Sequence, residues 1–164
     1  SLDFISRQSK KSAYIRGMKM EPSIFFYVEL EGEDLDILPL YELFSKYSCY
    51  GSHAGDTYYT YDADGTKHAH TRTKPYFQAR LEYQSPTENP LNDVACAFLN
   101  MFCYEGAPIL PLIEKQQVKI WCSVSSPAPQ MAMALTARTM SRLAALGLDM
   151  GVTVVQQGKI KPRT

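Results

Sequence analysis

The chain has no net charge and no long apolar run, and both absences narrow the classes of protein to which it can belong. Seventeen Lys and Arg residues balance seventeen Asp and Glu residues. A protein that binds nucleic acid or an anionic membrane usually has an excess of positive charge. No segment approaches the roughly 20 apolar residues of a transmembrane helix, and no apolar segment follows the basic N-terminal residues as in a secretory leader. We therefore expect a cytoplasmic protein that has no membrane partner and for which nucleic acid is an unlikely partner.

Recognisable catalytic motifs are also lacking. The sequence has no Gly-x-Ser-x-Gly nucleophile turn, no glycine loop for phosphate and no helix with paired zinc-binding histidines. Its four cysteines are too few and too irregularly spaced for a disulfide scaffold. We interpret them as buried thiols in a reducing compartment, and we expect a protein that is not an enzyme and binds neither cofactor nor metal.

One polar segment keeps an alternative open, because it contains all three histidines and one of the cysteines. Cys49 lies four residues before His53, and His68 and His70 are two residues apart. These side chains are of the types that bind zinc, although neither spacing is that of a common structural zinc site. With Asp56 as an acid they could also form a thiol-dependent catalytic centre. A metal- or thiol-dependent enzyme is therefore the alternative function.

The composition predicts one folded domain, because 45% of the residues are apolar and 21% are charged. Residues 1–20 are rich in Lys and Arg and show no sustained hydrophobic period, so we expect a basic N-terminal arm. Residues 21–157 form the predicted domain, and residues 158–164 form a basic tail.

The order of the predicted elements indicates an α+β fold. The strand-like segments are 24–30, 76–83, 118–124 and 151–155. The segments with helical spacing are 35–44, 94–102 and 129–146, with Asp34 as the cap of the first and Gly147 just beyond the last. Between the first helix and the second strand, Asp64-Gly65 predicts a hairpin turn. This order, strand-helix-hairpin-helix-strand-helix-strand, predicts a mainly antiparallel sheet of about five strands with helices packed on one face.

Two groups of side chains are candidates for binding a partner. The first is acidic and lies where the first strand meets the first helix, a position that also favours a solvated helix start; its members are Glu31, Glu33, Asp34 and Asp36. The second lies in and after the hairpin and mixes tyrosines with charged residues: Asp56, Tyr58, Tyr59, Tyr61 and Arg72. Such mixtures occur both at protein interfaces and where single-stranded bases stack, so a nucleic-acid binder is a further alternative.

The two ends of the predicted domain resemble the bacterial domain-of-unknown-function family numbered 4279. The resemblance lies in the strand-to-helix junction 25–36 and the helix-to-strand junction 143–154. It implies a small domain, in some cases an immunity protein that binds and neutralises a cognate bacterial toxin. We therefore expect a small protein-binding domain whose partner is another protein, and a homodimer through pairing of edge strands stays open.

Overall fold

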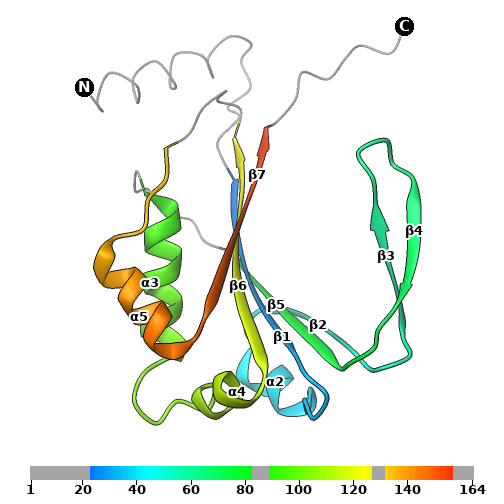
Figure 1. Cartoon of the computed structure of the whole chain (residues 1–164), viewed down its shortest axis with the longest axis horizontal. Coiled ribbons are helices and arrows are strands. Elements are labelled where there is room, and N and C mark those ends of the chain that lie inside the picture. Colours follow the sequence, from blue (N-terminus) through cyan, green and yellow to red (C-terminus); the bar gives the residue numbers. More distant parts are fainter. Residues whose placement is uncertain (1–22, 83–88, 127–131, 157–164) are drawn as a thin grey trace, which may run out of the picture.

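The computed structural model describes residues 23–82, 89–126 and 132–156. The predicted basic arm, residues 1–20, and the predicted tail, residues 158–164, lie outside the described residues. Within them, the chain forms a five-stranded sheet, a separate two-stranded sheet and four helices (Figure 1). The predicted α+β class is confirmed.

The five-stranded sheet has the order β2-β5-β1-β6-β7. Its strands are β1 (Ser23–Glu31), β2 (Ser48–Ser52), β5 (Tyr76–Glu82), β6 (Gln117–Ser126) and β7 (Asp149–Gln156). All neighbours pair antiparallel except β6 and β7, which are parallel. The sheet is therefore mainly antiparallel, as predicted, with one parallel edge strand.

Helices cover one face of this sheet, and we call the other face the open face. The helices are α2 (Leu38–Leu43), α3 (Pro90–Phe102), α4 (Leu110–Lys115) and α5 (Ala137–Leu146). Strand β1 alternates as a half-buried strand does, and Phe26, Val28 and Leu30 are buried on the helix side. Phe98 of α3 packs edge-on against Phe26 with ring centroids 5.7 Å apart. Figure 1 shows α3 and α5 together on this side of the sheet.

Three predicted helix starts were wrong. Helix α3 begins at Pro90 and not at Val94, because proline is well accommodated in the first turn of a helix. Helix α2 begins at Leu38 and not after Asp34, because the Asp36 carboxylate accepts the Leu38 backbone N–H at 3.2 Å and forms a turn just before the helix. Helix α5 begins at Ala137, where the Thr136 hydroxyl caps the first turn by accepting the Thr139 N–H.

The segment before α5 was assigned to the helix because it is rich in Met, Ala and Leu. Residues 132–136 are not helical, although Met133 and Leu135 still pack against the core. The remaining part of that prediction, residues 129–131, lies outside the described residues. Apolar composition therefore identified core contacts here but did not distinguish helix from extended chain.

Candidate interaction surface

Strands β3 (Thr57–Tyr61) and β4 (Lys67–Thr71) form a two-stranded hairpin that projects beyond the main sheet (Figure 1). We call this hairpin, residues 57–71, the arm; it is distinct from the predicted basic arm at residues 1–20. It is joined to the adjacent strands β2 and β5, so that the four strands form one bent ribbon. At the bend, the backbone N–H groups of Gly55 and Arg72 donate to the carbonyls of Arg72 and Asp56, each at 2.8 Å. The Asp56 carboxylate accepts the His53 N–H at 2.7 Å, and Gly55 has the positive φ that this turn requires.

The arm has no hydrophobic core behind it. Every residue from Tyr59 to Thr71 is exposed, and this range includes the last three residues of β3, the turn at the tip and all of β4. The tip is the predicted Asp64-Gly65 turn, in which the Asp64 carboxylate accepts the Thr66 N–H at 3.0 Å. Since an isolated two-stranded hairpin is at best marginally stable in water, its attachment to the domain determines how rigid it is.

Arg72 attaches the arm to the open face. Its guanidinium carbon lies 4.0 Å from the ring centroid of Tyr58, on the arm, and 3.8 Å from that of Tyr76, on β5. Two cation–π contacts on opposite strands of the bend therefore form a clamp, which we call the Arg72 clamp. The Arg72 Nε is buried and has no hydrogen-bond partner among the described residues, so the aromatic contacts are its main interactions.

Tyr76 of the clamp also belongs to a hydrogen-bonded cluster on the open face. The Tyr76 hydroxyl donates to one oxygen of the Glu29 carboxylate at 2.9 Å, and the Trp121 indole N–H donates to the other at 2.8 Å. Burial, with the nearby Glu29 charge, raises the pKa of Tyr76 well above its usual range, so that it stays a neutral donor. We call the end of the arm that joins β2 and β5 its foot. Strands β1, β5 and β6 are thereby linked to the foot of the arm.

Trp121 lies flat against the backbone of the neighbouring strand. A Cβ atom at Gly151, on β7, would lie 2.2 Å from the indole ring, a separation that is sterically forbidden. Glycine is therefore required there because of a close approach of the ring and not because of a special backbone conformation. This contact fixes the indole that donates to Glu29.

The side of the arm that bears Tyr58 faces the open face, because Arg72 contacts Tyr58 and Tyr76 at once. Strand alternation puts His70 and His68 on this same side. Tyr58 stacks on the His70 ring at 5.1 Å, and the His70 Nε2 lies 2.8 Å from the Thr60 hydroxyl. His68 Nε2 lies 2.7 Å from a carboxylate oxygen of Asp62. The polar side chains on this side of the arm thus pair with one another.

The opposite side of the arm presents two tyrosines to solvent. The exposed fractions are 49% for Tyr59 and 66% for Tyr61. The Lys67 ammonium lies 3.7 Å from the centroid of the Tyr59 ring and covers one of its faces. Tyr61, next to the tip, is the more accessible of the two.

The predicted acidic residues lie near the foot of the arm, at the end away from its tip. Glu31 pairs with Tyr76 at the foot, and Glu33 and Asp34 lie in the exposed turn that follows β1, near α2 and α4 (Figure 1). Asp34 and Asp36 line a shallow hollow of about 590 Å³ that also contains Lys115. The two predicted groups therefore do not form one surface: Tyr58 and Arg72 lie near the acidic residues, whereas Tyr59 and Tyr61 lie toward the tip.

The side chains of the alternative metal or thiol centre are not brought together. The Cys49 thiol donates to the backbone carbonyls of Phe44 and Tyr47 at 3.3 and 3.4 Å, whereas His68 and His70 lie on the arm. Among the described residues, no group of three or more His, Cys, Asp or Glu side chains could hold a metal ion. Burial raises the pKa of the Cys49 thiol, which makes it a poorer nucleophile at neutral pH.

The other cysteines are also unpaired thiols. Burial raises the pKa values of Cys103 and Cys122 to about 11. These two thiols are therefore protonated at neutral pH. The prediction of buried thiols is confirmed for Cys122 but is wrong for the others, since Cys49, Cys96 and Cys103 are half-buried.

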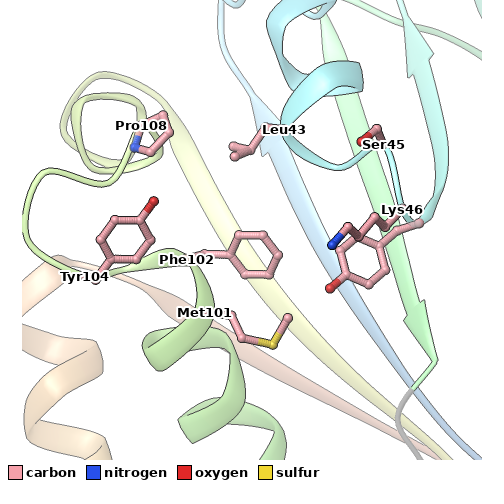
Figure 2. Close-up of a pocket in the computed structure, with 8 residues that line it drawn as sticks. Leu43, Ser45, Lys46, Met101, Phe102, Tyr104 and Pro108 are labelled. Carbon is pink, nitrogen blue, oxygen red and sulfur yellow. The ribbon is translucent and has the colours of Figure 1, made fainter.

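A small hollow lies between the turn after α2 and the C-terminal end of α3. Its volume is about 260 Å³, below the usual range for a drug-sized ligand. Figure 2 shows Phe102 and Met101 at its base, with Tyr104 on one side and Lys46 on the other. The hollow lacks the convergent polar groups of a catalytic site.

Sequence reasoning missed the Glu29, Tyr76 and Trp121 cluster. The alternation in 76–83 and 118–124 assigned Trp121 to the face opposite the core, but nothing in the spacing indicated which partner its N–H would reach. A buried tyrosine at the start of a strand and a single tryptophan opposite an acidic strand were the only available signals.

Comparisons with protein-family models, with curated proteins and with solved structures found no match. The resemblance to family 4279 therefore stays a prediction. In the part of the chain that the structure describes, no helix is long and apolar enough to cross a membrane.

Proposed function

We propose that this chain is a protein-binding domain that contacts its partner through the arm, and that it acts as an inhibitor of the immunity-protein type. The observation that supports this proposal is an arm whose residues from Tyr59 to Thr71 are all exposed and which is nevertheless clamped to the domain. Exposed tyrosines on a projecting element without a core bury little surface within the domain and so stabilise it little, but they are accessible for contact with a partner. Tyrosine and arginine are also the residue types that dominate binding energy at protein interfaces.

Preorganisation favours tight binding by such an arm. A tyrosine presents a large contact area at a low cost in side-chain entropy, since only two torsions must be fixed. The Arg72 clamp and the pairing of Tyr58 with His70 reduce the further entropy that the arm would lose when it binds. A rigid projecting hairpin of this kind suits insertion into a recess, such as the active site of an enzyme that is to be inhibited.

The aromatic contacts favour protein over single-stranded nucleic acid as the partner. Base stacking requires a free aromatic face. Arg72 covers one face of Tyr58 and His70 stacks on the same ring, while Lys67 covers one face of Tyr59. The rings that remain for stacking on the arm are Tyr61, which is more exposed, and the second face of Tyr59, and two rings are a small site for nucleic acid.

The acidic turn would add a second, electrostatic contribution. Glu33 and Asp34 are exposed at the foot of the arm, where they would face a basic rim around the recess that the arm enters. Charges at such a rim act mainly on the rate of association and on its salt dependence. The resemblance to family 4279 and the free thiols support a bacterial cytoplasmic protein whose target is a toxin.

Affinity capture with matched variants tests the proposal. The tagged chain, the double variant Tyr59→Ala/Tyr61→Ala and the control Tyr104→Ala would each be used as bait in lysate of the source organism. Tyr104 has an exposed fraction of 54% and lies after α3, so it matches the arm tyrosines in accessibility but not in position.

We expect one protein to be retained near 1:1 by the wild-type chain and by Tyr104→Ala, and to be lost with the double variant. A retained enzyme should then lose activity when the purified chain is added in equal amount. Equal retention by all three baits would contradict a binding role for the arm, and retention without loss of the partner's activity would contradict inhibition.

A further inference from the structure

The outer edge of β7 has the properties of an interface. Strand β7 is eight residues long and pairs with β6 on one side, and no strand among the described residues pairs with the other side. From Met150 to Gln156 it contains no charged residue. Val152 and Val154, on the helix side, have exposed fractions of 41% and 56%. An exposed apolar edge of this length readily pairs with another strand.

The usual protections of an edge strand are not found along this segment. Edges are normally made short, or interrupted by lysine, proline or a bulge. The opposite edge of the sheet is of that kind: β2 has only five residues, lies two residues after Lys46 and continues into the arm. Strand β7 is longer and has neither lysine nor proline from Met150 to Gln156.

We propose that a second copy of this chain pairs with the β7 edge, antiparallel to the first, to give a symmetric dimer with a continuous ten-stranded sheet. Charge favours a second copy over a charged partner, because the whole chain is neutral and the edge itself has no charge from Met150 to Gln156. Two identical edges can therefore approach without like-charge repulsion. A two-fold axis makes the contact self-complementary and closes the assembly at two copies.

This symmetry has a consequence for the arm. Two strands that pair antiparallel about an axis perpendicular to the sheet keep the open faces of both copies on the same side. The arm is attached at the β2–β5 side of each sheet, away from β7. The dimer would therefore present two arms from one face, at its two ends, so that two partner molecules or one symmetric partner could be bound. The dimer itself does not depend on the proposed function of the arm.

The test is the mass of the full chain in solution, measured by light scattering during size-exclusion chromatography over a dilution series. We expect the wild-type chain to have twice its 18.5 kDa mass and to dissociate on dilution. Val154→Lys should raise the dissociation constant by about tenfold or more, since burial of a valine is lost and each copy would bring a charge into an otherwise uncharged edge. Met101→Lys, at an exposed residue of α3 with 49% exposure, is the control and should remain dimeric.

A wild-type chain that is monomeric throughout the series, or that forms open-ended larger species, would overturn the proposal. A dimer that is unaffected by Val154→Lys would also overturn it. If the variant does not fold, hydrogen exchange of the wild-type chain replaces it: amides of Met150–Gln156 should become more protected as concentration rises, and concentration-independent exchange there would overturn the proposal.

Discussion

Replacement of Arg72 by methionine should release the arm while leaving the five-stranded sheet intact. Methionine keeps an unbranched apolar side chain between Tyr58 and Tyr76 but removes the cation from both contacts. The change therefore tests the charge of the clamp and not only its volume.

The expected change in the free energy of arm opening is the loss of two cation–π contacts, partly offset by the relief of one desolvation cost. Because Arg72 is half-buried, each cation–π contact is worth about 1 kcal/mol, so that the pair contributes about 2 kcal/mol. Removing the buried, unpaired Nε of Arg72 relieves a desolvation cost of about 1 kcal/mol, which partly offsets this loss. We expect the arm to open more easily by about 1 kcal/mol, which is about a fivefold change in an equilibrium constant.

Native-state hydrogen exchange measures this opening, because arm and sheet amides are reported separately. In Arg72→Met, the paired amides of Thr57–Tyr61 and Lys67–Thr71 should exchange about fivefold faster, and those of β1 and β6 should be unchanged. Arg80→Met is the matched control, since Arg80 lies 3.9 Å from the Phe25 ring within the main sheet. Unchanged arm protection in Arg72→Met, or an equal effect of Arg80→Met on the arm, would refute the clamp.

Three further predictions concern the open face and the core. Glu29→Gln should cost about 1–2 kcal/mol of unfolding free energy in urea titrations, because the Trp121 and Tyr76 donors then share one acceptor; an unchanged stability would contradict the cluster. Gly151→Ala should cost about 1–3 kcal/mol and shift the fluorescence of the single tryptophan to the red, since the new methyl group displaces the indole; an unchanged spectrum would show that the ring does not lie there. Raising the pH above about 9 should lower the unfolding free energy, because the pKa of Cys122 is about 11 in the folded state and its unfolded reference is 9.0, and the unfolded thiol therefore loses its proton first; Cys122→Val should flatten this decline by about 2–3 kcal/mol, and identical profiles would contradict it.

The sheet could be predicted from the sequence because its central strands have a simple pattern. The alternation of Phe77, Ala79 and Leu81 with polar residues identified β5 and its buried face. Strand β2 was missed because Ser48–Ser52 has small and polar residues and pairs only at an edge, where half burial is enough. The start of α5 was misplaced because the tertiary contacts of Met133 and Leu135 satisfy the same apolar pattern without a helix.

The candidate surface was predicted in composition but not in geometry. The sequence showed that Tyr58, Tyr61 and Arg72 lie near a hairpin. It could not show that Arg72 joins the arm to β5, since that contact depends on the bend at Gly55. Nor could it show that the acidic turn lies at the foot of the arm, away from Tyr61, because the separation is a consequence of the three-dimensional ribbon and not of sequence distance.

The most direct test of the account is photo-crosslinking in cells of the source organism. A benzophenone amino acid would replace Tyr61, near the tip of the arm, and in a second strain Tyr104, which is similarly exposed but lies after α3. The account predicts a single covalent adduct to one other protein from position 61 and none to that protein from position 104. An adduct to a partner from position 104 alone, or no adduct from position 61, would contradict an arm that binds a partner.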